Sequence, residues 1–266
     1  MNHCKICKSI KIKLKFVYKS KPEGETDFGI KKKRYYREFF KCSDCGHMFS
    51  ESKLEISNFY EGSYTNLTYG SSLSEKFEKI INLPLKKSDN EGRFLFLKKK
   101  CSKILSTNKI KILDIGSGLG IFPWRVNREK WEVTALDPDS QNIEHIKSRI
   151  GIKTIHGDFL GVKISTKYNL VTFNKVIEHV KDPRAFIIKA KSIIRQDSFI
   201  YVEVPDVQAA KYGKDREEFF IEHFHVFSEK SIKLLAIDCG LKCLCANSCI
   251  EPSGKFTLRA IFVNSQ

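Results

Sequence analysis

The chain of 266 residues is long enough for one large α/β domain with a small appendage, and its 41% of hydrophobic residues excludes a disordered chain. No stretch approaches the roughly 18–20 uninterrupted apolar residues that span a bilayer, and no apolar segment follows residues 1–5, so we expect a cytoplasmic protein without a membrane partner. The net charge of +16 keeps nucleic acid among the partners considered, although only ten of the 47 basic residues are arginine, the residue suited to forked phosphate contacts.

Residues 1–52 form a basic first segment that is framed by two Cys-x-x-Cys pairs. Apolar residues alternate with lysine over 10–16, which predicts a half-buried strand, and residues 34–40 predict a second strand that returns the chain to the second pair. Thiolates at this spacing indicate a closed structural Zn²⁺ site, because a short basic segment has little core of its own. The predicted ligands of this zinc-ribbon-like module are Cys4, Cys7, Cys42 and Cys45, with His47 as an alternative ligand.

Residues 53–108 are predicted to connect this module to the rest of the chain. Aromatic residues come first, at positions 59, 60, 64 and 69. Apolar residues then recur at three- and four-residue spacings over 94–105, which predicts a helix that covers the domain behind it.

From residue 109 to residue 266, strands and helices alternate. The predicted strands cover residues 110–115, 131–136, 152–155, 168–173, 199–204, 241–250 and 256–263. One predicted helix has Pro123 in its first turn and runs to about residue 130. The other predicted helices cover residues 141–150, 183–195 and 229–239, the last with Ser228 as its N-cap. This alternation indicates a parallel sheet with helices on both faces, and the turn at 252–254 predicts an antiparallel hairpin for the last two strands.

A glycine-rich turn follows the first of these strands, where residues 112–120 read ILDIGSGLG. Its glycines would let main-chain N–H groups approach a ligand that a Cβ would exclude. An NAD-type turn would have its third glycine at position 121, which is isoleucine here. The acidic Asp114 before the turn also suits a ligand with a cationic amino-acid part better than a pyrophosphate.

The next two strand ends carry acids. Asp137 ends the second strand, where a carboxylate can accept both ribose hydroxyls of a nucleoside. Asp158 follows the third strand, where it is placed to reach an adenine amino group, with Phe159 packing near the ring. The three strand ends in this order predict a nucleoside-binding site; the alternative is that these residues only form turns.

Residues 109–266 resemble the class I S-adenosylmethionine (SAM)-dependent methyltransferases in these motifs. The resemblance implies a Rossmann-like α/β fold with a seven-stranded sheet whose last strand is reversed. It also implies that the glycines lie beneath the methionine part of SAM, with Asp137 on the ribose and Asp158 at the adenine. The residues predicted to bind the cofactor are Asp114, Gly116, Ser117, Gly118, Gly120, Asp137, Pro138, Asp158, Phe159 and Asn174.

Residues 174–183 follow the fourth strand, at the sheet edge where open α/β folds bind ligands. His179 has the pKa range of a general base, and Glu178 beside it would orient a ligand or a chain segment. The alternative is a structural histidine in a helix-initiating turn. Some O-methyltransferases with this Glu-His motif bind a divalent cation through a further Glu three residues earlier; that position is Lys175 here, so we predict no catalytic metal.

A second histidine cluster lies in residues 219–228, just before the predicted helix that begins at 229. Two histidines among aromatic residues predict a lid over an acceptor pocket. We expect His223 with Glu222 to be the general base, and His179 as the second choice. The alternative is that His223 and His225 form a structural pair.

The Glu-His motif of residues 222–223 and the two cysteine pairs resemble the nucleotide-sugar C-methyltransferases, which have a zinc-binding segment before the SAM domain. This chain departs from that family in ending soon after the SAM domain and in having Lys8 where a glycine is usual. The resemblance implies methyl transfer to an anionic small molecule, a sugar or nucleotide-sugar. The alternatives are an RNA methyltransferase that grips RNA through its basic zinc module, and a non-catalytic scaffold.

Overall fold

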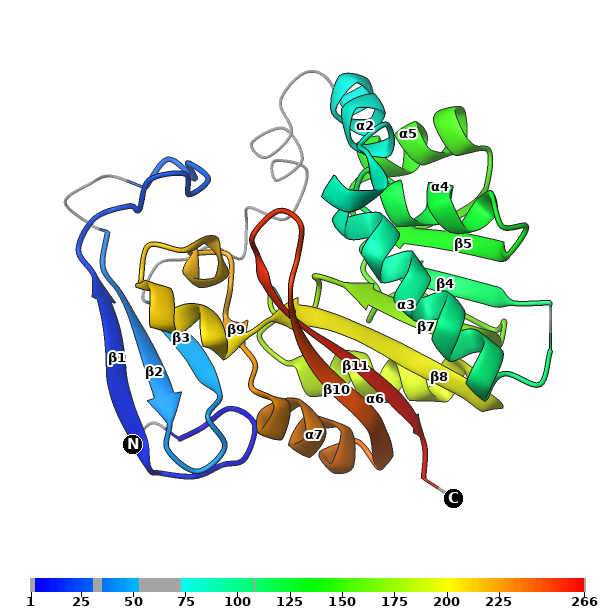
Figure 1. The fold of residues 1–266 in the computed structure, drawn as a ribbon. Coiled ribbons are helices and arrows are strands. Elements are labelled where there is room, and N and C mark those ends of the chain that lie inside the picture. Colours follow the sequence, from blue (N-terminus) through cyan, green and yellow to red (C-terminus); the bar gives the residue numbers. More distant parts are fainter. Residues whose placement is uncertain (1–2, 31–34, 53–72, 108, 266) are drawn as a thin grey trace.

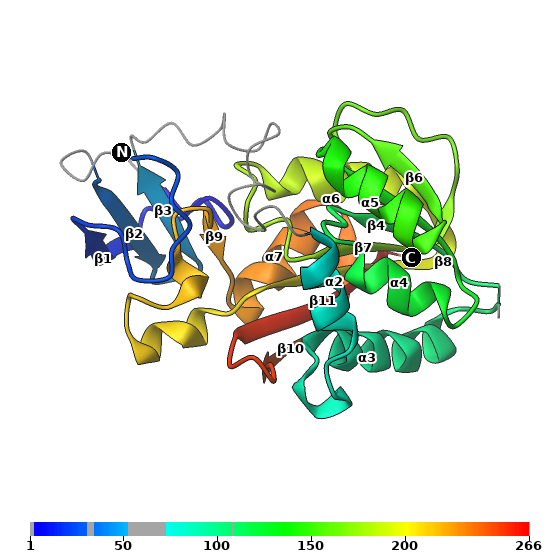
Figure 2. The ribbon, with the colours of Figure 1, turned by 90° about the horizontal axis from the view of Figure 1, so that it is seen from above.

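The computed structural model of the chain describes residues 3–30, 35–52, 73–107 and 109–265. These residues form a seven-stranded sheet with helices on both faces and a four-stranded sheet beside it (Figure 1). Figure 2 shows the small sheet at one end of the molecule, away from α5 (Ser140–Ile150) and β6 (Lys153–His156). The aromatic part of the predicted connector, positions 59 to 69, lies outside the described residues.

The large sheet has the strand order β10-β11-β8-β7-β4-β5-β6. Its strands are β4 (Lys111–Ile115), β5 (Glu132–Asp137), β6, β7 (Tyr168–Asn174), β8 (Ile194–Pro205), β10 (Leu241–Ile250) and β11 (Phe256–Asn264). Pairing is parallel from β6 to β8, whereas β11 runs antiparallel to both of its neighbours. The predicted Rossmann-like sheet with a reversed last strand is therefore confirmed.

Helices cover the two faces of this sheet. Buried apolar residues of α3 (Asp89–Ile104) and α4 (Ile121–Asn127) pack on one face against strand residues such as Ile112 and Leu170. Residues from α6 (Pro183–Ile193) and α7 (Glu229–Asp238) pack on the other face with Leu113 and Val171. A further helix, α2 (Leu73–Ile81), precedes α3. No helix among the described residues is long and apolar enough to cross a membrane.

Two helix ends differ in detail from the sequence prediction. Helix α4 begins at Ile121 after the N-cap Gly120, so Pro123 lies in its first turn as predicted, but the helix ends at Asn127 rather than at Lys130. Helix α6 ends at Ile193, because the chain passes directly into β8, where Ile194 already pairs with Tyr168. The predicted N-cap Ser228 is confirmed, and its hydroxyl accepts from the N–H of Ser231.

The small sheet contains β1 (Ile12–Tyr18), β2 (Arg37–Cys42), β3 (Met48–Ser52) and β9 (His225–Val226) in that order. The first two strands overlap the strands predicted over 10–16 and 34–40 but begin two and three residues later, and β3 and β9 were not predicted. Strand β9 comes from the region just before α7 and pairs antiparallel with β3. The N-terminal module is therefore completed by a segment that lies far along the chain.

Candidate active site

The glycine turn after β4 has the conformation that its sequence predicts. The turn glycines have φ values of 65° at Gly116, 52° at Gly118 and 74° at Gly120, in the left-handed region. Gly116 to Gly118 are partly exposed, so their main chain is accessible to a ligand, whereas Gly120 is buried. Ser117 donates its hydroxyl to the carbonyl oxygen of Asp114 at 3.0 Å, which closes the turn.

Asp137 at the end of β5 lies directly beside this turn. Its Oδ2 accepts from the N–H of Gly118 at 2.7 Å, and its Oδ1 accepts from the N–H of Asp139 at 2.9 Å. Asn142, a residue that the sequence analysis did not single out, donates to the same Oδ1 at 3.1 Å. Burial raises the pKa of Asp137, and these donors oppose that effect by stabilising the charged form. The carboxylate is therefore fixed next to the glycines, with Pro138 beginning the loop that follows.

Asp114 and Asn174 form a pair between β4 and β7. Asp114 Oδ1 accepts from Thr172 Oγ1 at 2.6 Å and from Asn174 Nδ2 at 2.7 Å. Burial raises the pKa of Asp114 to about 6. Because Asn174 gives its amide group to this bond, its Oδ1 atom is left buried and without a hydrogen-bond partner among the described residues. An acceptor at this place suits an ammonium group on a ligand.

Asp158 and Phe159 follow β6 and differ in their surroundings. Asp158 is exposed, and its Oδ2 accepts from the N–H of Gly161 at 3.0 Å. Phe159 is only 2% exposed, and its ring lies 5.8 Å from that of Phe173 and 5.6 Å from that of Phe186. We therefore correct the prediction for Phe159: its ring belongs to the hydrophobic core and offers almost no surface to an adenine.

The two predicted histidine motifs meet in space. The rings of His179 and His223 lie 4.7 Å apart, and His179 Nδ1 lies 3.0 Å from the main-chain oxygen of Glu222. The main-chain oxygen of Glu178 accepts from the N–H of Phe224 at 2.8 Å. Residues 219–225, called the histidine loop below, are thus bound to the turn after β7.

Burial sets the charges in this cluster. It lowers the pKa of His179 to about 4 and that of His223 well below its ordinary value, so both rings are neutral at pH 7. Burial raises the pKa of Glu222 to about 7 and that of Glu178 to about 8. Glu222 accepts a hydrogen bond from His179 through its main-chain oxygen, and the sequence pattern did not indicate this contact.

Glu178, predicted to orient a ligand or a chain segment, lies beside the two histidines. Its carboxyl is fully buried, has no hydrogen-bond partner among the described residues, and lies 4.0 Å from His179 Nε2. Ligand atoms of Glu178, His179 and His223 lie within 4.8 Å of one another, so this group could hold a cation. Lys175, which led us to predict no catalytic metal, donates its ammonium to Thr257 Oγ1 at 2.7 Å.

The four predicted zinc ligands also come together. The Sγ atoms of Cys4 and Cys45 lie 3.6 Å apart, those of Cys7 and Cys42 lie 3.5 Å apart, and all four lie within 4.8 Å of one another. Zn–S bonds of about 2.3 Å in a tetrahedron give S–S separations of about 3.8 Å, so the cluster fits a Zn²⁺ ion. The alternative ligand His47 is not part of this group: its Nε2 lies 3.1 Å from His225 Nδ1.

A family model described as a methyltransferase domain matches residues 89–246, which is more than half of the chain. The chain belongs to this family. The chain is 36% identical over 85 residues to the mitochondrial ubiquinone biosynthesis O-methyltransferase of Schizosaccharomyces pombe, a match that covers 29% of this chain and 31% of that protein. It is 25% identical over 142 residues to the ubiquinone biosynthesis O-methyltransferase of Rickettsia canadensis, covering 48% of this chain and 60% of the relative. The chain thus spans about a third to three fifths of the length of these curated relatives.

Solved structures show the same fold as the methyltransferase domain. One is the 1,6-didemethyltoxoflavin-N1-methyltransferase of Burkholderia thailandensis with S-adenosylhomocysteine (SAH), at 11% identity and a TM-score of 0.59 over 84% of this chain and 98% of that chain. Another is the magnesium protoporphyrin IX methyltransferase of Synechocystis PCC 6803 with SAH, at 12% identity and a TM-score of 0.58 over 80% of this chain and 100% of that chain. At these identities the likeness shows the fold alone.

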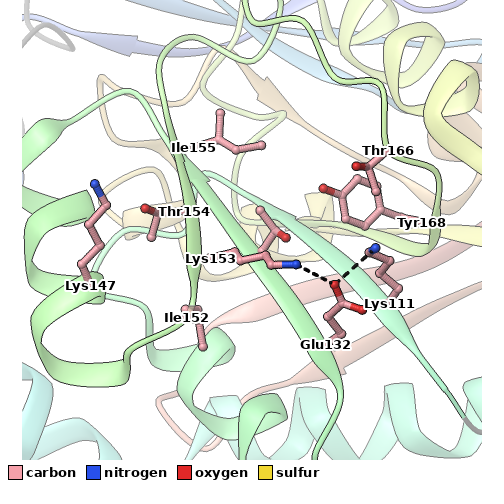
Figure 3. A pocket seen from close by; sticks show the side chains of 10 residues that line it. Lys111, Glu132, Lys147, Ile152, Lys153, Thr154, Ile155, Thr166 and Tyr168 are labelled. Atoms are coloured by element: carbon pink, nitrogen blue, oxygen red, sulfur yellow. Dashed lines mark hydrogen bonds and ion pairs between the residues drawn. The ribbon is translucent and has the colours of Figure 1, made fainter.

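The hollow drawn in Figure 3 is separate from the candidate site of the methyltransferase domain. It has a volume of about 490 Å³ and lies where β4, β5 and β6 begin, whereas the glycine turn follows the end of β4. Lys111 and Lys153 each form an ion pair of 3.2 Å with Glu132 in its wall. Two of the three lysines that line this hollow therefore share one carboxylate, and the third is Lys147.

Gly120 is expected to be a structural rather than a ligand-contacting glycine of the methyltransferase domain. A Cβ at this position would lie 2.8 Å from Ile146 Cγ1 and 2.7 Å from Ile150 Cδ1, in addition to the strain of a left-handed φ. Gly120→Ala should lower the free energy of unfolding by about 3 kcal/mol. Gly151→Ala is a matched control, because Gly151 has a φ of 72° and open space around it, and should cost about 1 kcal/mol. Equal losses in chemical denaturation would contradict the packing role of Gly120.

Glu178 should make stability depend on pH in a direction that its burial determines. Its pKa of about 8 in the folded protein exceeds the ordinary value of 4.5. The stability that the protonated carboxyl contributes is therefore full below about pH 4.5 and is lost as pH rises through about 8. Between these limits the wild type should lose several kcal/mol relative to Glu178→Gln, measured as free energies of unfolding in denaturant. Parallel pH curves for the two proteins would be inconsistent with a neutral Glu178.

Proposed function

We propose that the chain transfers a methyl group from SAM to a small-molecule acceptor. The observation that carries this proposal is the arrangement at the ends of β4, β5 and β7. The partly exposed glycine turn, the fixed carboxylate of Asp137 and the unpartnered Asn174 Oδ1 lie there. These groups match the main chemical parts of SAM. Membership of the methyltransferase-domain family supports the same reaction.

The residues present would hold the cofactor through distinct contacts. The main chain of Gly116 to Gly118 and the Asn174 oxygen would hold its methionine part, with Asp114 orienting Asn174. Asp137 would accept the ribose hydroxyls, and the exposed Asp158 would accept the adenine amino group. SAM supplies an electrophilic methyl group, so the protein mainly has to align the acceptor with it.

The histidine cluster is proposed to take a proton from the acceptor. His223 is our first choice and His179 the second, because burial keeps both rings neutral near pH 7. The bond from His179 Nδ1–H to the Glu222 oxygen leaves His179 Nε2 as the accepting atom. A base in this place suits an acceptor with a hydroxyl or an acidic C–H group, and contributes about 10²–10⁴-fold to the rate.

The sugar or nucleotide-sugar class of the acceptor rests on the sequence resemblance. The curated relatives are named as O-methyltransferases of ubiquinone biosynthesis, and none of these names concerns a sugar. The many lysines favour an anionic acceptor. RNA stays the alternative acceptor, and the experiment below distinguishes it from small molecules.

The proposal is tested by incubating the purified protein with SAM that carries a labelled methyl group, in the presence of a nucleotide-sugar pool, a total small-metabolite extract, or total RNA. We expect label in a small molecule, and a rate that falls by about 10²–10⁴-fold in His223→Asn. His145→Asn serves as the control, because His145 lies in α5 against Phe77, outside the cluster. Label in RNA alone would contradict the small-molecule acceptor, and an undiminished rate in His223→Asn would contradict the base.

A further inference from the structure

Two buried side chains of the N-terminal module hold the main chain of the histidine loop. Arg37 Nη1 donates to the carbonyl oxygen of Phe219 at 2.5 Å. The N–H of Ile221 donates to Glu25 Oε1 at 2.7 Å. Arg37 is 0% exposed and Glu25 is 4% exposed, so both contacts are shielded from water. The main chain of the loop is therefore hydrogen-bonded on either side of residue 220, directly before the Glu-His motif of residues 222–223.

The two gripping side chains also hold each other. Arg37 Nη2 forms an ion pair of 3.0 Å with Glu25 Oε1, and the Tyr35 hydroxyl donates to Glu25 Oε2 at 2.5 Å. The Arg37 guanidinium lies 4.2 Å from the centre of the Tyr18 ring, and Tyr18 in turn donates its hydroxyl to the carbonyl oxygen of Lys214 at 2.5 Å. Glu25, Tyr35 and Arg37 are called the clamp below.

A buried ion pair is a costly way to stabilise a small module. Removing two charges from water offsets most of their attraction, and apolar side chains of the same volume often serve stability as well or better. The directional bonds of Arg37 and Glu25 instead fix where the atoms of Phe219 and Ile221 lie. What the clamp adds is thus a defined position for the loop.

The residues held by the clamp lie within two positions of the histidine cluster along the chain. Glu222, next to Ile221, accepts from His179 Nδ1 through its main-chain oxygen at 3.0 Å, and the His223 ring lies 4.7 Å from the His179 ring. A displacement of the loop would change the distance between the two rings and the tautomer of His179. Displacements of about 1 Å in a reacting group can cost about 100-fold in rate.

We propose that Glu25, Tyr35 and Arg37 are positioning residues of the active site, through which the N-terminal module orients His179 and His223. This inference deepens the proposed function and rests on it for the catalytic role of the histidines. It assigns to the module a task besides its zinc site: its clamp holds a loop of the methyltransferase domain.

The test uses the full-length, zinc-loaded protein with ¹³C-labelled histidine, and follows ring signals by NMR over a pH series. In Glu25→Gln and Arg37→Met, the ring signals of His179 and His223 should shift relative to those of the wild type, because the loop that carries His223 and bonds to His179 is no longer held in place. Affinity for SAH, measured by calorimetry, should stay within about twofold of wild type, because the clamp's hydrogen bonds go to the histidine loop and to one another. Arg125→Met is the matched control, since Arg125 also pairs with a carboxylate, Glu91 at 2.7 Å, but in another part of the domain.

Tyr35→Phe provides a milder change in case Arg37→Met does not fold, because it removes one hydroxyl from Glu25 and keeps the ion pair. It should give shifts in the same direction as Glu25→Gln but smaller. The inference is overturned if the two histidine signals in folded Glu25→Gln and Tyr35→Phe coincide with those of the wild type. Failure of the wild type to bind SAH would instead contradict the proposed function, and the ring signals would still report on the clamp.

Discussion

Asp137→Ala should weaken binding of SAH by at least about 100-fold. The proposed ribose contacts are hydrogen bonds to a charged acceptor, each contributing about 1.5–3 kcal/mol, and 1.4 kcal/mol corresponds to a factor of ten. The substitution also removes the acceptor for the N–H of Gly118, which holds the glycine turn against β5. Calorimetric titration of the purified variant with SAH measures the effect.

Two comparisons give this prediction its controls. Asp137→Asn keeps the size of the side chain and should weaken binding less than Asp137→Ala, because one oxygen acceptor remains. Asp197→Asn removes an exposed negative charge far from the glycine turn and should leave the affinity unchanged. An affinity of Asp137→Ala close to that of Asp197→Asn would show that Asp137 does not hold the ribose.

Loss of the metal should unfold the N-terminal module and release the histidine loop, while the large sheet stays folded. Zn²⁺ contributes about 10–16 kcal/mol to the folding of small zinc domains, which is more than the whole stability of many domains. The module also holds the later chain directly: Ser228 Oγ donates to the carbonyl oxygen of Cys45 at 2.5 Å, and His47 contacts His225 at 3.1 Å. In Cys42→Ser, hydrogen exchange should therefore accelerate by at least about 100-fold in β2, β3 and β9.

The control for this prediction is Cys249→Ser, which removes a thiol outside the cluster of four. The zinc content of Cys249→Ser should stay at the wild-type value, whereas Cys42→Ser should lose zinc. Elemental mass spectrometry measures the amount of zinc per protein chain. Exchange in β4 and β7 should stay slow in both variants. Retained zinc or unchanged exchange of β3 in Cys42→Ser would contradict a structural metal in this cluster.

The sequence predicted the large sheet well because its signals are local. Strands β4 and β8 contain short, buried apolar runs, and the turn at Gly116 follows from glycines whose φ values only glycine adopts readily. Ser228 as an N-cap is local in the same sense. The two cysteine pairs were found because metal ligation leaves a fixed spacing.

What the sequence did not predict depends on contacts between distant segments. Strand β9 is two residues long and carries no periodic pattern, so only its pairing with β3 defines it. Phe159 follows Asp158, for which we predicted an adenine contact, yet its ring turns into the core between Phe173 and Phe186. The clamp on the histidine loop joins residues separated by more than 180 positions, such as Arg37 and Phe219, and no motif indicates such a pair.

The central claim, that the ends of β4, β5, β6 and β7 form a SAM site, is tested most directly by titrating ¹⁵N-labelled protein with SAH and following the amide signals by NMR. We predict saturable shifts that are largest at Gly116 to Gly118, at Asp137 to Asp139 and at Asp158. An absence of saturable shifts, or shifts confined to the hollow lined by Lys111, Glu132 and Lys153, would contradict the claim.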